Sequence, residues 1–143
     1  MSLNGTYDDN NLFAKILRGE VPAVKVYEDD AVLAFMDIFP QARGHLLVIP
    51  KVKVRNFLEL PPTLVAPLLE RVHWLTKGVV KALNPDGVTV TQFNGEDSGQ
   101  TIFHLHFHII PRYAGVRLAG HGHSNRADIP QLGEIAQQII AAL

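Results

Sequence analysis

The chain has 143 residues, of which 47% are hydrophobic and 19% are charged, and its formal net charge is −1. This length suits a single domain, and the apolar fraction excludes an intrinsically disordered chain. The near-neutral charge argues against binding of long nucleic acid, although it leaves room for a small anionic ligand. The absence of cysteine excludes disulfides, thiolate zinc sites and a catalytic thiol.

The sequence carries no sign of a membrane or targeting segment. No run of about 18 apolar residues occurs, so we expect no membrane span. The first ten residues are polar and acidic, unlike a secretory signal. We therefore expect a cytoplasmic protein with a flexible N-terminus at residues 1–10 and one domain at residues 11–143.

The first half of the chain predicts one short helix followed by three strands. Residues 11–18 carry an apolar stripe at helical spacing. The apolar runs 24–27 and 31–36 are separated by an acidic turn, which predicts a hairpin. Residues 45–49 predict a third strand that ends at Pro50.

The second half predicts a long helix, two strands and a terminal helix. Two prolines open the amphipathic helix over residues 61–83. Residues 88–94 and 102–110 predict strands, and Asp128 can cap a last helix that runs to residue 143. Strands joined by short turns predict an antiparallel five-stranded sheet with helices on one face, an α+β fold.

Three histidines alternate with apolar residues in the last predicted strand. Because alternate side chains of a strand share a face, His104, His106 and His108 would line one wall, roughly 6.5–7 Å apart. Two chemistries fit such a wall. One is a three-histidine metal site, and the other is nucleophilic catalysis by an imidazole whose neighbours donate to an anion.

The loop before this strand favours the second chemistry. Residues 94–101 include Gly95 and Gly99, which permit unusual backbone angles and close approach of a ligand. Such a loop can present backbone N–H groups to phosphate oxygens. A polar loop that leads directly into a histidine strand therefore favours phosphate chemistry over a metal cage.

Several motifs, in one order, resemble the histidine-triad (HIT) family of nucleotide hydrolases and transferases. They lie between about Leu12 and Arg112 and comprise FAKI at 13–16, GEVP at 19–22, AFMDI at 34–38, GHLLVIPK at 44–51, the pairs NG at 94–95 and GQ at 99–100, and HLHFHII at 104–110. The similarity is to the branch of histidine-triad nucleotide-binding proteins, which resembles purine nucleoside phosphoramidases. It implies the histidine-triad fold, with a long helix and a C-terminal helix beside the sheet, and a homodimer.

The resemblance also implies the roles of four histidines. His106 would attack the α-phosphorus and form a covalent nucleotidyl-histidine that water hydrolyses. His104 and His108 would flank the phosphate, and His45 would face them from the neighbouring strand. Such a nucleophile needs a neutral ring whose other proton is held by a fixed acceptor, and a backbone carbonyl near the strand could be that acceptor.

A nucleotide site follows from the same resemblance. Asp37 would accept hydrogen bonds from the ribose hydroxyls, although it could instead only cap a turn. The phosphate or ribose oxygens would be held by Asn94, Gly99, Gln100 and Thr101, and the base would lie between Phe13, Ile16, Phe35, Ile38 and Leu47.

The chain departs from the family pattern in ways that bear on metals and on the reaction. Some members carry a Cys-x-x-Cys and a structural zinc, but residues 11–14 are Asn-Leu-Phe-Ala, so we expect no zinc, no other metal and no cofactor. The third triad position is His108 rather than the glutamine of the transferase branch, which favours hydrolysis. His121 and His123 could bind a metal, but we interpret their loop as flexible because nothing nearby completes a ligand set.

The sequence therefore predicts a nucleotide hydrolase that acts without long nucleic acid or membrane partners. It would cleave at the α-phosphate of nucleoside 5′-phosphoramidates or related nucleotide conjugates. A dinucleoside polyphosphate hydrolase, for example one acting on diadenosine tetraphosphate, is an alternative. A nucleotide-binding interaction protein with incidental catalysis and a three-histidine metallohydrolase are two others.

Overall fold

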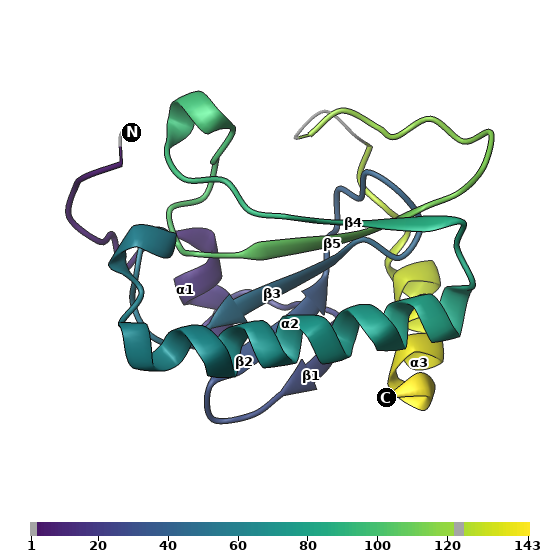
Figure 1. The fold of residues 1–143 in the computed structure, drawn as a ribbon, viewed down its shortest axis with the longest axis horizontal. Helices are drawn as coiled ribbons and strands as arrows, with labels where there is room; N and C mark the ends of the chain where they lie inside the picture. The colour runs from purple at the N-terminus through teal and green to yellow at the C-terminus, as the bar shows by residue number, and fades with distance from the viewer. Residues whose placement is uncertain (1–2, 122–124) are drawn as a thin grey trace.

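The computed structural model describes residues 3–121 and 125–143. Its elements follow the predicted order (Figure 1). They are α1 (Leu12–Leu17), β1 (Lys25–Glu28), β2 (Val32–Met36), β3 (Leu46–Pro50), the 3-10 turn η1 (Phe57–Glu59), α2 (Pro62–Leu83), β4 (Gly87–Thr91), the 3-10 turn η2 (Glu96–Ser98), β5 (Phe107–Arg112) and α3 (Ile129–Ala142). None of the helices in the described ranges combines the length and the hydrophobicity that a membrane span needs.

The strands form one antiparallel sheet in the order β1-β2-β3-β5-β4. This confirms the predicted α+β fold with a five-stranded sheet, a long helix and a C-terminal helix. β5 lies between β3 and β4, so His108 has Leu47 on one side and Thr91 on the other. β5 is therefore an internal strand at the position of His108.

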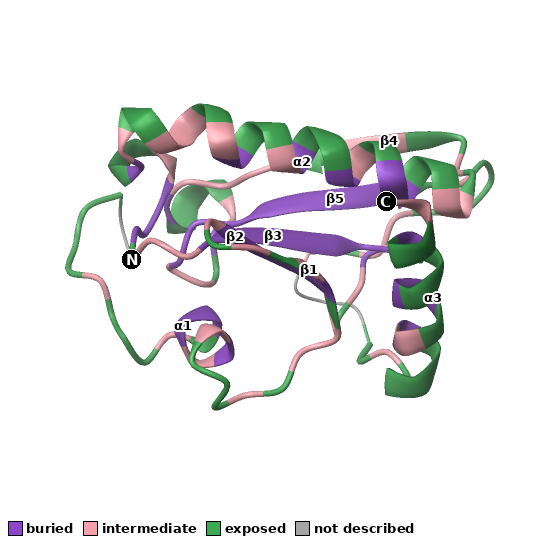
Figure 2. Cartoon of the chain, turned by 90° about the horizontal axis from the view of Figure 1, so that it is seen from below, coloured by how far each residue is buried: buried purple, intermediate pink, exposed green. Residues whose placement is uncertain are grey.

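The two faces of the sheet are covered by different helices (Figure 2). Alternate β2 side chains point to opposite faces, so Ala34 joins the main core under α2 and α3 while Leu33 and Phe35 join a smaller cluster. Phe13 and Ile16 of α1 complete that smaller cluster. The prediction that the helices share one face is correct for α2 and α3 and wrong for α1, because both faces of β2 are apolar.

β5 differs from the prediction at both ends. It begins at Phe107 rather than at residue 102, and it continues through Pro111 to Arg112. β3 pairs with β5 only as far as Ile109, so the end of β5 is paired on one side, where proline is tolerated. His104 consequently lies in irregular backbone before the strand and does not follow the strand's alternation.

Candidate active site

A pocket with a volume of about 170 Å³ opens on the face of the sheet that carries α1. Residues from α1, β2, β3 and the turn after α1 supply its apolar lining. Its polar lining includes four imidazoles, those of His45, His106, His108 and His121. Of the residues predicted from the sequence, those that line the pocket are Phe13, Ile16, Phe35, Asp37, Ile38, His45, Leu47, Thr101, His106 and His108.

His106 is held in the tautomer that a nucleophile needs. Its Nδ1 lies 2.7 Å from the carbonyl oxygen of His104. Because a carbonyl can only accept, Nδ1 carries the proton and Nε2 keeps a free lone pair. Burial lowers the pKa of His106 to about 4, so the ring is neutral near pH 7. The carbonyl acceptor that the sequence argument required is therefore present.

A chain of hydrogen bonds orients His108 in the opposite tautomer. The backbone N–H of Gln41 donates to Nδ1 of His45 at 3.0 Å, so Nε2 of His45 carries that ring's proton. This Nε2 donates to Nδ1 of His108 at 2.9 Å, which leaves the His108 proton on Nε2. That buried N–H has no hydrogen-bond partner among the described residues. His108 therefore offers one unused donor in the pocket, where it suits an anionic oxygen.

Burial keeps the imidazoles of His45 and His108 neutral. It lowers the pKa of His45 to about 3 and that of His108 to about 2, and neighbouring imidazoles add to both shifts by charge repulsion. Oδ2 of Asp37 lies 3.6 Å from Nε2 of His45, but a neutral imidazole forms no ion pair with it. The orientation of His45 and His108 is therefore set by their hydrogen bonds rather than by charge.

Among the described residues, the carboxylate of Asp37 uses only one of its oxygens in a hydrogen bond. Its Oδ1 accepts from the backbone N–H of Phe39 at 2.8 Å. Burial raises the pKa of the Asp37 carboxyl from its ordinary value. The turn-capping role considered from the sequence is thus present, and Oδ2 remains able to accept a hydrogen bond from a ligand hydroxyl.

His104 lies behind the nucleophile rather than in the pocket. Its ring is fully buried, with Nε2 donating to the carbonyl of Pro50 at 2.8 Å and Nδ1 accepting from the hydroxyl of Tyr7 at 2.5 Å. The structure brings its carbonyl oxygen, not its ring, to the site. Direct contact between the His104 ring and a phosphate stays a prediction, and both ring nitrogens are already bonded to the protein.

The glycine-bracketed loop is held together by buried side chains. Gly95 and Gly99 adopt positive φ angles of 87° and 111° on either side of η2. Oε1 of Gln100 accepts from the N–H of Gly95 at 2.9 Å, and its Nε2 donates to the carbonyl of Arg55 at 2.7 Å. The side chain of Gln100 therefore links the loop to the backbone at Arg55.

Asn94 has a similar internal position. Its Oδ1 accepts from the backbone N–H of Phe57 at 2.9 Å, which ties the loop to η1. Of the four residues predicted to hold phosphate or ribose oxygens, Thr101 lines the pocket, while Asn94, Gly99 and Gln100 do not. Ligand contacts by those three stay predictions, and in the structure they shape the loop that carries Thr101.

His121, considered from the sequence only as a possible metal ligand on a flexible loop, lines the pocket. Its ring lies 5.4 Å from that of His108, and its Nε2 donates to the carbonyl of Gly99 at 3.0 Å. Two hydrogen bonds between Gln41 and Ala119 hold the surrounding loop over the site. Interpreting the loop as flexible missed this placement, and His123 lies outside the described residues.

One group of described residues could hold a metal ion. The ligating atoms of Asp37, His45 and His108 lie within 4.8 Å of one another. Such a donor set suits Zn²⁺, but an ion there would replace the hydrogen bond between the two imidazoles. Metal binding at this group and the hydrogen bond from His45 to His108 would therefore exclude each other.

Comparison with known proteins assigns the family, because the HIT domain model matches residues 18–115. The chain belongs to the HIT family. It is 43% identical over 101 residues to the adenosine 5′-monophosphoramidase hnt1 of Schizosaccharomyces pombe, an alignment that covers 71% of this chain and 73% of that protein. It is 41% identical over 109 residues to the adenylylsulfatase HINT3 of Arabidopsis thaliana, covering 76% of this chain but only 55% of the relative. The crystal structure of a Hit-like protein from Bartonella henselae superposes with a TM-score of 0.91 at 50% identity, covering 97% of this chain and 100% of that one.

Proposed function

We propose that this HIT protein hydrolyses nucleotide conjugates at the α-phosphate, with nucleoside 5′-phosphoramidates as its substrate class. The observation that carries the proposal is the pair of opposite tautomers in one pocket. His106 keeps a free Nε2 lone pair, and His108 keeps an unused Nε2–H. A nucleophile beside a preorganised donor is the arrangement that attack on a phosphate requires.

The reaction would proceed in two displacements at phosphorus. Nε2 of His106 attacks the α-phosphorus, the bond to the leaving amine breaks, and the amine takes up a proton from solvent. The nucleotidyl group then resides on His106, whose Nδ1–H remains bonded to the carbonyl of His104. Water attacks the same phosphorus and gives its proton to solvent, which releases the nucleoside monophosphate and restores the lone pair. Throughout, Nε2–H of His108 donates to a non-bridging oxygen.

The remaining pocket residues favour a nucleoside as the fixed part of the substrate. The free Oδ2 of Asp37 can accept from ribose hydroxyls. The apolar lining around Phe13 and Phe35 offers faces between which a base can lie. The monophosphoramidase name of the fission-yeast relative supports this substrate class.

The adenylylsulfatase name of the plant relative favours a second candidate substrate, a nucleotide that carries sulfate as its leaving group. Both substrates share the nucleoside and the α-phosphate, so the same atoms of His106 and His108 would act on each. Only the group that departs differs.

A substrate panel tests the proposal. Turnover of adenosine phosphoramidate, adenylyl sulfate and diadenosine tetraphosphate would be measured for the wild type and for His106→Ala. We expect the phosphoramidate to have the highest kcat/KM and the variant to be inactive on every substrate. Faster turnover of the tetraphosphate would favour a dinucleoside polyphosphate hydrolase. Nucleotide binding without turnover would favour an interaction protein.

We further propose that the protein is a homodimer that associates through β4 and α2. β4 is an edge strand on which Val90 is 45% exposed. The outer surface of α2 also exposes Leu69 and Val80. Exposed apolar side chains beside an open strand edge are typical of a protein interface. Sedimentation equilibrium should give twice the chain mass, and a monomer at assay concentrations would contradict the assignment.

A further inference from the structure

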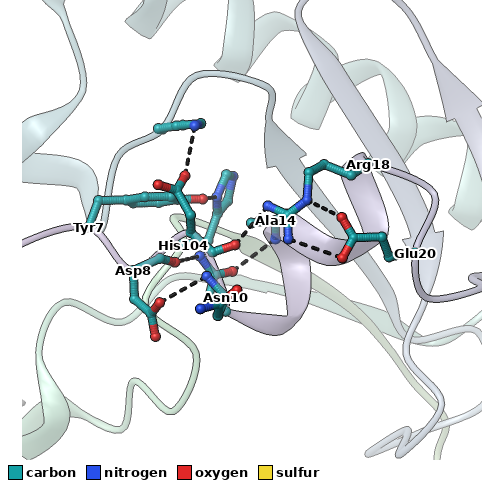
Figure 3. Close-up of polar contacts among 10 residues, drawn as sticks. Tyr7, Asp8, Asn10, Ala14, Arg18, Glu20 and His104 are labelled. Carbon is teal, nitrogen blue, oxygen red and sulfur yellow. Dashed lines mark hydrogen bonds and ion pairs between the residues drawn. The ribbon is translucent and has the colours of Figure 1, made fainter.

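Tyr7 contacts the histidine that supports the nucleophile (Figure 3). Its hydroxyl lies 2.5 Å from Nδ1 of His104, and the two rings meet edge to face with centroids 5.7 Å apart. Because Nε2 of His104 donates to the carbonyl of Pro50, Nδ1 has a lone pair and the hydroxyl of Tyr7 is the donor. Tyr7 therefore completes the bonding of this buried ring.

His104 is consequently held on three sides. Tyr7 and Pro50 bond its two ring nitrogens, and its own carbonyl oxygen accepts from Nδ1 of His106. The residue lies in irregular backbone before β5, outside the strand pairing. The peptide group that carries its carbonyl is held on the other side by the N–H of Leu105, which donates to the carbonyl of Val54 at 3.0 Å. The position of the carbonyl that selects the His106 tautomer therefore depends on this backbone bond together with the contacts made by the His104 side chain.

The segment that carries Tyr7 is attached to the body of the protein on both sides of this residue. The carbonyl of Leu3 accepts from the buried side chain of Asn56 at 2.9 Å. The carboxylate of Asp9 pairs with Lys53 at 2.7 Å. The flexibility predicted for residues 1–10 stays a prediction, but residues 3–9 have specific partners in the connection between β3 and α2.

We propose that Tyr7 is a positioning residue of the active site. Its hydrogen bond to His104 holds the carbonyl that orients the imidazole of His106, so the N-terminal segment forms part of the catalytic apparatus. This inference rests on the proposed role of His106 as nucleophile. Tyr7 does not line the pocket, so its loss should impair the step at phosphorus and leave nucleotide binding intact.

Tyr7→Phe tests the proposal because it keeps the ring and removes only the hydroxyl. The change leaves a buried acceptor without its partner, so the ring of His104 can move. We expect kcat to fall on the order of tenfold while KM stays within about twofold. The matched control is Tyr27→Phe, which removes a hydroxyl that donates to Asp29 at 2.7 Å, away from the pocket. Both variants should lower the Tm, but kcat of the control should equal that of the wild type.

A double-variant comparison shows whether Tyr7 acts through His104. Tyr7→Phe should lower kcat in the wild-type background and cause no further loss in a His104→Asn background, because the bond is already absent there. Equal losses in both backgrounds, or wild-type kcat for Tyr7→Phe, would overturn the proposal.

A spectroscopic measurement and a parallel variant complete the test. With ¹⁵N-labelled histidine, the Nδ1–H proton of His106 should exchange with solvent faster in Tyr7→Phe than in the wild type, and an unchanged rate would count against the proposal. His106→Asn, assayed in parallel, separates the two hypotheses. An inactive His106→Asn beside a fully active Tyr7→Phe defeats the inference alone, whereas an active His106→Asn defeats the proposed function on which it rests.

Discussion

The two imidazoles that line the pocket from β5 and its start are chemically identical but are oriented by different means. His106 is oriented locally, by a carbonyl two residues earlier in the chain. His108 is oriented over a long range, by His45, which is itself oriented by the backbone of Gln41. The bond to the carbonyl of His104 keeps the proton of His106 on Nδ1, so its Nε2 is unprotonated. The bond from His45 keeps the proton of His108 on Nε2. Because of these contacts, His106 presents a lone pair at Nε2 and His108 presents a proton at Nε2.

The largest effect should come from removing the lone pair. His106→Asn should lower kcat by about 10⁴-fold or more, because the lone pair that would form the covalent intermediate is lost. The affinity for nucleoside monophosphate should remain nearly unchanged, since the pocket is kept. Steady-state kinetics and calorimetric titration with AMP would measure the two quantities. A variant that loses binding as severely as turnover would contradict the assignment.

Removing the donor should have a smaller effect. His108→Ala should lower kcat by about 10²–10³-fold, the usual effect of losing one charge-stabilising group. His45→Ala should approach the same loss, because His108 then lacks the contact that places its proton on Nε2. The double variant should be no slower than the slower single variant. Additive losses in rapid-quench measurements would show that His45 acts independently of His108.

The ribose contact should affect binding rather than chemistry. Asp37→Ala should raise KM for ribonucleotide substrates by roughly 10–100-fold with little change in kcat, because a hydrogen bond to a charged group acts equally on substrate and transition state. A 2′-deoxy substrate should reproduce much of this loss with the wild type. Identical kinetics for the ribo and deoxy substrates would remove Asp37 from this role.

The buried imidazoles should also make stability depend on pH. The pKa values of His45, His106 and His108 are lowered by burial, so the unfolded chain binds protons first as the pH falls. The free energy of unfolding should therefore be highest above about pH 6.5 and should decrease below it, by up to about 1.4 kcal/mol per pH unit for each proton. Urea titrations at pH 7 and pH 5 would measure this slope, and His108→Ala should reduce it. A slope that is the same in both proteins would show that His108 does not contribute.

The sequence predicted the parts of the site that depend on local pattern and on motif. Phe35 of β2, Leu47 of β3 and the histidines at 106 and 108 line the pocket. His104 does not, because the N–H of Leu105 bonds to the carbonyl of Val54 and the chain becomes a strand only at Phe107. A rule that assumes alternation along a strand cannot detect where the strand begins.

Contacts between residues far apart in the chain could not be predicted from the sequence either. His121 reaches the pocket because Gln41 bonds to Ala119, which lies 78 residues further along the chain. Gln100 is internal because its amide finds partners in the loop and at Arg55. Polar residues of these types are equally suited to a ligand or to the protein's own backbone, and only the folded positions decide between the two.

The covalent intermediate provides the most direct test of the account. The wild type and His106→Asn would be mixed with adenosine phosphoramidate that carries ³²P at the α-phosphate, quenched in alkali and separated by denaturing electrophoresis. The account predicts acid-labile, alkali-stable label on the wild type and none on His106→Asn, with label still accumulating, more slowly, on His108→Ala. Label that persists on His106→Asn would contradict the assignment of Nε2 of His106 as the nucleophile.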